Sequence, residues 1–209
     1  MTTTRLERAF FEEDVLDVAP SLLGGLLTHG GVTVRLTEVE AYAGDVDPGS
    51  HAYRGLTPRT AVMFGHPGHL YVYFTYGMHW CANVVCGPEG QASAVLLRAG
   101  EVVAGHSTAA ARRDGISPRD WARGPARLAQ TLGLGREQNG LDLCAEPGEA
   151  RIDLPAARPP RTAIRTGPRV GVAGAGGDAA AYPWRFWLHG EPTVSVYRPA
   201  KPRRRRETA

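Results

Sequence analysis

Residues 32–42 read Val-Thr-Val-Arg-Leu-Thr-Glu-Val-Glu-Ala-Tyr, and this stretch decides the fold. Its apolar residues recur with period two, which predicts a β-strand. One face of that strand carries Val32, Val34, Leu36, Glu38, Glu40 and Tyr42. The apolar face therefore runs into two carboxylates, which must pair or shift their pKa values if they are buried. Buried carboxylates are concentrated at functional sites, whereas a strand end that runs into solvent would give the same pattern without a function.

The length and composition favour one domain. A chain of 209 residues with 43% hydrophobic content can bury one good-sized core, so we expect a single domain over residues 1–197. No apolar run reaches the roughly 18 residues of a membrane helix, and residues 1–11 lack a signal-peptide core. Cys81, Cys86 and Cys144 form no CxxC pair, which indicates reduced thiols. We therefore expect a cytoplasmic protein, associated with the nucleoid if it is bacterial.

The net charge of +3 is concentrated at one end of the chain. Residues 198–209 hold six cations against one acid, and we expect this basic, proline-broken tail to be disordered. Such a tail either attracts nucleic-acid phosphates without regard to sequence or only keeps the protein soluble.

The remaining elements follow from periodicity and from turn residues. We predict two short helical pieces within 12–27, an ordered loop at 44–59, a β-hairpin from 70–74 and 79–85, a strand at 92–98, helices at 102–113 and 124–132, short strands at 151–154 and 169–172, and a terminal hairpin from 185–189 and 193–197. Strands and helices do not alternate regularly. The fold class we predict is therefore α+β, a single compact domain with a curved antiparallel β-sheet flanked by helices and a protruding hairpin.

The tip of the predicted hairpin is unusually hydrophobic. Tyr76 and Met78 stand where polar turn residues are usual, and an exposed aromatic tip favours a partner. Tyr71 and Tyr73 share one face of their strand, while Phe74 and Tyr76 share the other. Tyr73 can therefore face a pocket while Tyr76 points elsewhere, as a wedge inserted into a duplex would.

Residue types suited to purine recognition are dense around this hairpin. Tyr42, His51 and Tyr73 supply flat faces, Asn83 supplies an amide and Glu40 a carboxylate. Two flat side chains that face each other would form a slot for one extruded base. Taken singly, each aromatic residue is more often part of a core.

A set of motifs runs in order through most of the chain. The segments are 38–42, 50–55, 57–59, 63–65, 70–79, 96–99, 123–128 and 183–186. Together they resemble the 3-methyladenine (alkyladenine) DNA glycosylase family. The chain departs from the family's pattern at Gly49, where alanine is frequent, at Thr60, where asparagine is frequent, and at Arg127, where lysine is common.

The resemblance implies a role for each matching residue. Glu40 matches the general base that activates the attacking water, and Arg98 matches a basic residue beside that water. Tyr42, His51 and Tyr73 match the residues that sandwich the flipped base. Asn83 matches the residue that rejects guanine, and Tyr76, with Met78 beside it, matches the residue that fills the gap in the DNA stack.

The resemblance also implies an activity and a partner. It implies a DNA glycosylase of base excision repair that flips the base and hydrolyses its N-glycosidic bond. The substrates would be alkylated or deaminated purines in double-stranded DNA, namely 3-methyladenine, 7-methylguanine, hypoxanthine and ethenoadenine. We expect a monomer without a cofactor.

Elementary chemistry agrees with these roles. Breaking an N-glycosidic bond builds positive charge on the sugar, so a carboxylate there stabilises the charge and can take a proton from water. A lyase mechanism normally needs an amine, and the only lysine is Lys201 in the tail, which favours a monofunctional enzyme. We assign Glu38 mainly a structural role, while Asp45 and Asp47 either serve the site or only shape their loop.

Other functions remain open from the sequence. His66, His69 and His79 lie near Cys81 and Cys86, but their spacing does not match a usual zinc site. A non-catalytic damaged-DNA-binding module would use the same aromatic residues and would not need Glu40. A hydrolase of free nucleosides would not need the hydrophobic hairpin tip.

Overall fold

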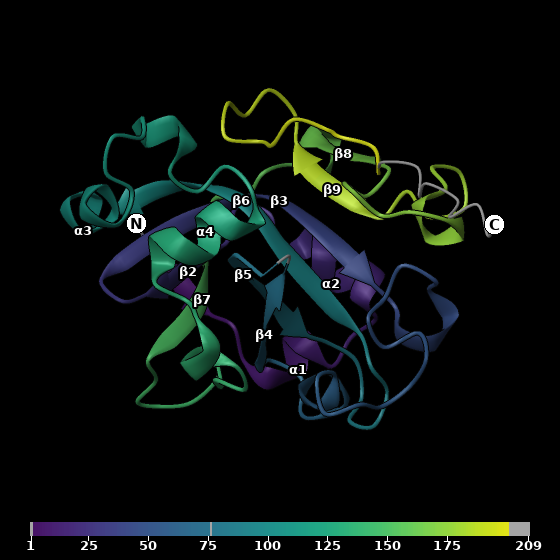
Figure 1. Ribbon diagram of the computed structural model, residues 1–209. Helices are drawn as coiled ribbons and strands as arrows, with labels where there is room; N and C mark the ends of the chain where they lie inside the picture. The colour runs from purple at the N-terminus through teal and green to yellow at the C-terminus, as the bar shows by residue number, and fades with distance from the viewer. Residues whose placement is uncertain (1, 76, 201–209) are drawn as a thin grey trace.

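An antiparallel β-sheet built around β3 organises the chain (Figure 1). The computed structural model describes residues 2–75 and 77–200, and its sheet has nine strands in those ranges. The strands are β1 (Thr3–Arg5), β2 (Leu26–His29), β3 (Val32–Tyr42), β4 (Leu70–Thr75), β5 (His79–Val85), β6 (Ala94–Ala104), β7 (Ala150–Pro155), β8 (Ile164–Gly167) and β9 (Arg185–Leu188). The order is β1-β7-β2-β3-β6-β5-β4, and β9 pairs with both β3 and β8.

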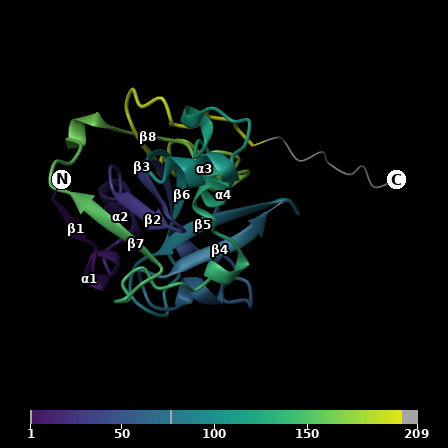
Figure 2. The same cartoon turned by 90° about the vertical axis from the view of Figure 1, so that its left-hand side faces the viewer.

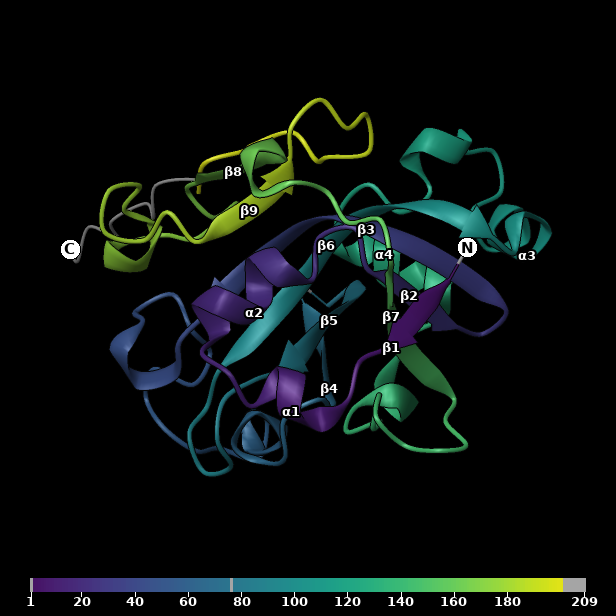
Figure 3. The same cartoon turned by 180° about the vertical axis from the view of Figure 1, so that it is seen from behind.

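Four short α-helices accompany the sheet in the described part of the chain. They are α1 (Arg8–Phe11), α2 (Val15–Ser21), α3 (His106–Arg112) and α4 (Pro125–Leu132). The α4 helix confirms the prediction for 124–132: proline stands in its first turn, and Gly133 ends it with a left-handed φ of 72°. Figure 3 brings α1 and α2 to the front, whereas α4 faces the viewer in Figure 1.

The hydrophobic core joins the helices to the central strands. Leu22 of α2, Leu128 of α4 and Leu36 of β3 belong to one buried apolar cluster. A mixed domain with an antiparallel sheet and few helices confirms the predicted α+β class.

A β-bulge changes the faces of β3. The strand confirms the predicted bounds 32–42, but its register against β6 shifts on both sides of Glu38. Leu36 and Val39 consequently both face the core, although their numbers differ in parity. The prediction that Glu40 and Tyr42 continue the face of Val32–Leu36 was therefore wrong. Glu38 and Glu40 have no exposed area, which rules out a strand end in solvent.

Three other segments differ from the predictions. Residues 102–104 extend β6, because Val102 and Ala104 pair with β3, and only 106–112 of the predicted helix 102–113 are helical. Residues 193–197 and 169–172 form no strand. The hairpin partner of β9 is β8, while Thr193 and Ser195 bind β3 through their side chains. In the 12–27 region α2 continues through Pro20, and residues 26–29 are β2.

The β4–β5 hairpin extends away from the body of the domain (Figure 2). Tyr73 pairs with Cys81, and Thr75 pairs with His79 at the last described pair before the turn. The predictions made for Tyr76 and for residues 201–209 lie outside the described residues. Within residues 2–75 and 77–200, no helix is long and apolar enough to cross a membrane.

Candidate active site

A cavity of about 490 Å³ opens between the hairpin, β3 and the segment 170–173. Its volume lies within the roughly 300–1,000 Å³ that is typical of small-molecule sites. Among the predicted site residues, the cavity is lined by Tyr42, His51, Tyr73, Asn83 and Arg98. Antiparallel pairing brings together Tyr42, Tyr73, Asn83 and Arg98, because β3, β6, β5 and β4 are neighbours in the sheet, and His51 joins them from the loop after β3.

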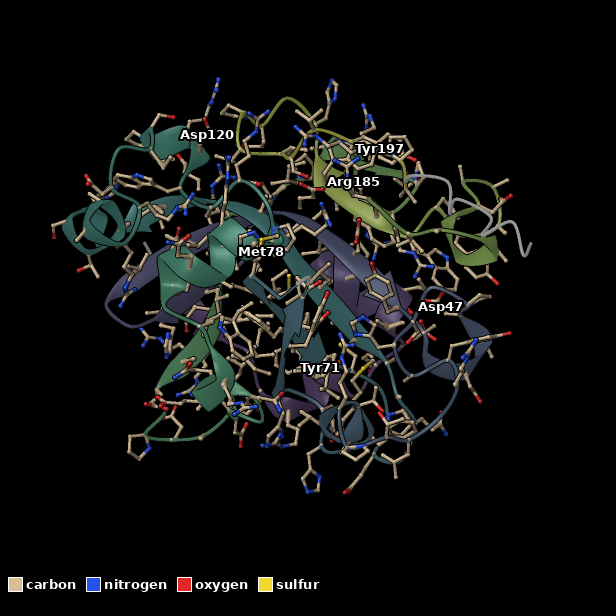
Figure 4. The ribbon with its side chains drawn as sticks, in the orientation of Figure 1. Asp47, Tyr71, Met78, Asp120, Arg185 and Tyr197 are labelled. Atoms are coloured by element: carbon tan, nitrogen blue, oxygen red, sulfur yellow. The ribbon has the colours of Figure 1, made fainter. Side chains whose placement is uncertain are left out.

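One wall of the cavity is aromatic. The rings of Tyr71 and Tyr73 stack with centroids 5.4 Å apart, and His51 meets Tyr73 edge-on at 4.6 Å. The Nδ1 atom of His51 lies 3.1 Å from the Tyr71 hydroxyl (Tyr71 is labelled in Figure 4). Asn83 donates an amide hydrogen bond of 3.0 Å to the Tyr71 carbonyl. The rings are therefore fixed by packing and by hydrogen bonds before any ligand binds.

The imidazole of His51 is neutral at physiological pH. Its ring lies partly buried against the tyrosines, and this burial, together with the Arg59 guanidinium, lowers the pKa of His51 to about 4. A neutral imidazole carries one donor and one acceptor nitrogen.

Glu40 is buried directly behind the cavity wall. Its Oε1 atom accepts a hydrogen bond of 2.7 Å from the backbone N–H of Val170. Its Oε2 atom accepts one of 2.9 Å from the Tyr42 hydroxyl and one of 3.3 Å from Nη1 of Arg98. All three donors belong to residues that line the cavity.

Glu38 has a different set of partners. Its Oε1 atom accepts hydrogen bonds from Nε of Arg98 at 2.9 Å and from Nε of Arg185 at 2.6 Å. Ser195 donates its N–H to Oε2 at 2.7 Å and its hydroxyl to Oε1 at 2.9 Å. Burial would raise the pKa of Glu38, but the two guanidinium groups outweigh it and lower the pKa. The carboxylate therefore holds Arg98 beside Glu40.

Met78 of the hairpin lies outside this cluster. Met78 is 67% exposed, and Figure 4 labels it on the hairpin. Met78 is absent from the described residues that line the cavity, and Tyr76 lies outside the described part of the chain.

The sequence did not identify the buried groups that support the site. Arg169 pairs with Asp47 behind Tyr42, Val170 binds Glu40, and Arg185 and Ser195 bind Glu38. Arg169, Val170 and Ser195 come from irregular backbone, which hides any periodicity, whereas Arg185 is the first residue of β9. The Arg-Val-Gly-Val run at 169–172 is a signal for this segment, but its pattern predicts a strand that the structure does not contain.

Known proteins match this chain over most of its length. A family model for methylpurine-DNA glycosylase matches residues 9–192. A relative from Streptomyces avermitilis is 54% identical over 97% of this chain and 96% of its own. A relative from Leifsonia xyli subsp. xyli is 53% identical over 95% of each chain. A relative from Burkholderia lata is 51% identical over 91% of this chain and 90% of its own. The names of all three relatives assign them to the 3-methyladenine DNA glycosylases.

The class of protein is thereby defined as an enzyme, a hydrolytic DNA glycosylase. The family is defined as well, because its model covers far more than half of the chain. The chain belongs to the methylpurine-DNA glycosylase family.

Proposed function

We propose that this protein is a monofunctional DNA glycosylase of base excision repair. It flips a damaged purine out of double-stranded DNA, binds the base in the 490 Å³ cavity and hydrolyses its N-glycosidic bond. The proposed substrates are 3-methyladenine, 7-methylguanine, hypoxanthine and ethenoadenine. We further propose that it acts as a monomer in the cytoplasm, on the DNA of the nucleoid.

The aromatic wall supports the binding of a flipped base. Tyr42, His51 and Tyr73 line the cavity and would contact a purine there, and stacking on an aromatic face contributes roughly 1–3 kcal/mol per base. The Asn83 amide lies on the same cavity wall, where it would obstruct the exocyclic amine of guanine. The exposed Met78 and the neighbouring Tyr76 would fill the gap that the flipped base leaves in the DNA stack.

The hydrogen bonding of the two glutamates carries the proposal for the catalytic group. A carboxylate offers about four acceptor positions. Glu38 accepts four hydrogen bonds from Arg98, Arg185 and Ser195, three of them at Oε1 and one at Oε2. The described residues supply three donors to Glu40, which leaves one position for a water molecule. All three donors to Glu40 belong to residues that line the cavity, so Glu40 can take a proton from a water molecule there, whereas Glu38 pairs with two guanidinium groups.

Arg98 completes the proposed chemistry. Its Nη1 atom contacts Glu40 and its side chain lines the cavity, so it can hold the attacking water against the carboxylate. As the glycosidic bond breaks, positive charge builds on the sugar, and the nearby Glu40 carboxylate stabilises it.

Release of free base from duplex DNA tests the proposal. Oligonucleotides that contain each of the four lesions are incubated with the wild type, with Glu40→Gln and with Glu137→Gln, whose side chain is exposed. We expect base release and an uncleaved abasic strand from the wild type and Glu137→Gln. Glu40→Gln should bind lesion DNA but release base at least on the order of 10²-fold more slowly, the range for a lost general base.

Three other results would contradict the proposal. Full activity of Glu40→Gln would remove Glu40 as the base. Binding of lesion DNA without release by the wild type would indicate a binding module. Equal activity on free nucleosides and on duplex DNA would indicate a nucleoside hydrolase.

A further inference from the structure

Arg169 is a charged side chain held completely inside the protein. It is 1% exposed, and its guanidinium makes two hydrogen bonds to the Asp47 carboxylate, of 2.5 and 2.6 Å. Its Nη1 atom also donates to the Ala41 carbonyl at 2.9 Å, and Nη2 donates to the Gly176 carbonyl at 2.7 Å. Asp47 is labelled in Figure 4. Burying such a pair costs desolvation free energy, so the pair is weak evidence for a purely stabilising role.

The guanidinium lies behind the ring of Tyr42. The Cζ atom of Arg169 is 4.5 Å from the Tyr42 ring centroid, and the rings of Trp184 and Tyr182 surround the same guanidinium at 5.4 and 5.6 Å. A cation at this distance attracts the face of an aromatic ring. Tyr42 also lines the cavity and donates to Glu40, so Arg169 fixes a ring that contacts both the base site and the carboxylate.

The next residue in the chain binds the same carboxylate. Val170 donates its N–H to Glu40 at 2.7 Å, and 170–173 line the cavity. This segment has no strand partner. It is held by the anchored side chain of Arg169 and by a backbone hydrogen bond of 3.1 Å from the Gly171 N–H to the Arg198 carbonyl. The buried guanidinium of Arg169 thus helps to place two of the three donors to Glu40.

The partner of Arg169 organises another wall. Asp47 accepts backbone hydrogen bonds from Ala43 at 3.2 Å and from Gly49 at 2.8 Å. The segment it holds in this way leads directly to His51, which faces the aromatic wall. The ion pair thus joins three separate parts of the cavity.

We propose that Arg169 is a positioning residue for catalysis, which acts on Glu40 through Tyr42 and through the Val170 N–H. This inference rests on the proposed function, in which Glu40 activates water. Its physical basis is the planar fork of the guanidinium, which binds a carboxylate through two parallel bonds and stacks on a ring at the same time. A lysine ammonium keeps the charge but can do neither.

Gly49 provides the space that this arrangement requires. A methyl group on Gly49 would overlap Nη2 of Arg169 and would stand 3.0 Å from its Cζ and from Cγ1 of Val172. The φ of Gly49 is outside the left-handed region, so the backbone itself would accept alanine. Gly49→Ala introduces the residue that is frequent in the family, and in this chain it requires the guanidinium to shift while every charged group stays in the protein.

A double-mutant cycle on single-turnover base release tests the inference. The variants are R169K, G49A, the double variant, and R165K as a matched control, since Arg165 is exposed on β8. Enzyme is in excess over lesion DNA, so that an unfolded fraction does not change the rate constant. R169K should lower that constant roughly 10- to 100-fold, the range for removing a partner that orients a site residue, and R165K should match the wild type.

We expect the effects of G49A and R169K on the rate constant to be coupled. G49A should also slow base release, and the double variant should be no slower than R169K alone, because lysine leaves the space of Nη2 empty. The affinity for DNA that carries an uncleavable abasic analogue should stay within about threefold of wild type for G49A.

Several outcomes overturn the inference. Wild-type rate constants for R169K with only a lower Tm would make Arg169 purely structural. Additive effects of G49A and R169K would disprove the coupling. If R169K does not fold, G49A alone decides, and an unchanged rate constant for it overturns the inference. Failure of the proposed function is separate, because the wild type itself would then release no base.

Discussion

Glu38 and Glu40 lie two residues apart and have different surroundings. Both are fully buried, and Arg98 touches both. The difference lies in the other partners: Glu38 binds a second arginine and a serine, whereas Glu40 binds a tyrosine hydroxyl and one backbone N–H. Environment rather than residue type thus separates a structural carboxylate from a candidate base.

Substitution of Glu38 should expose its structural role. Glu38→Gln leaves Arg98 and Arg185 buried without a full counter-charge, so the free energy of unfolding at pH 7 should fall by about 3 kcal/mol. Urea unfolding followed by far-UV circular dichroism gives this quantity. A loss below about 0.5 kcal/mol would show that the network does not support the fold.

The same variant gives a pH dependence of known sign. The pKa of Glu38 is lowered in the folded protein, so its stabilising contribution is present above its ordinary value of 4.5 and is lost as the pH falls through the folded-state value. The stability difference between wild type and Glu38→Gln should therefore be largest near neutrality and should narrow below pH 4.5. A difference that widens in acid would contradict the lowered pKa.

His51 should titrate far below an ordinary histidine. Partial burial and Arg59 lower its pKa to about 4, so the ring should stay neutral between about pH 5 and 8. The chemical shift of the His51 ring Cε1 proton in NMR spectra, assigned with His51→Gln, should have its midpoint near pH 4. Arg59→Gln should raise that midpoint. A midpoint near 6.5 in the wild type would show that the ring is as accessible as in a peptide.

At the scale of elements, the bulge in β3 is the feature that the sequence concealed. The residue pattern predicts the strand and its ends correctly, because the alternation of apolar residues is regular on each side of the bulge. The bulge itself depends on the pairing of β3 with β6, where Leu36 faces Gly100 and Glu38 faces Ala99. Such a long-range contact has no local signal, although bulges are common beside active sites.

Gly100 is required opposite this bulge. A methyl group there would overlap Cγ1 of Val34 and the carbonyl oxygen of Arg35. Gly100→Ala should therefore lower the free energy of unfolding by roughly 1–3 kcal/mol through overpacking, and it should slow base release because Arg98 lies two residues away. Thermal unfolding and single-turnover assays measure the two effects.

Gly135→Ala is the matched control for this substitution. The nearest atom to a methyl group there is Oε1 of Gln138, at 3.9 Å. The free energy of unfolding of Gly135→Ala should stay within about 0.5 kcal/mol of the wild-type value. Equal free energies of unfolding for Gly100→Ala and Gly135→Ala would show that β3 and β6 can separate at the bulge without loss of stability.

The other differences from the predictions have the same origin. Local patterns found the hairpin and α4, whose determinants are neighbouring residues. They failed at 102–104, where the β-branched Val102 and Val103 extend β6 along β3, and at 193–197, where side chains of an irregular segment bind β3. In the site, the residues on regular strands were predictable, while Arg169 and Ser195 act from irregular backbone.

At the scale of the whole molecule, charge is unevenly distributed along the chain. The net charge is +3, and Arg203, Arg204, Arg205 and Arg206 follow one another near the C-terminus. Residues 198–209 carry +5, so residues 1–197 carry 3 − 5 = −2, and the excess of positive charge lies at this end. We propose that the basic residues 198–209, which follow the glycosylase domain of 1–197, supply sequence-independent contacts to phosphates.

Neutralising the four arginines in the full-length chain tests this proposal. In Arg203→Gln/Arg204→Gln/Arg205→Gln/Arg206→Gln, binding to undamaged and to lesion DNA should weaken by the same factor. The slope of log K against log[salt] should fall in magnitude by about 0.9 for each phosphate that the variant no longer neutralises. The single-turnover rate constant at saturating enzyme should not change, because the buried carboxylate network lies in the glycosylase domain. An unchanged salt slope would instead make this end of the chain a solubilising segment, since a cation that touches no phosphate releases no counterion.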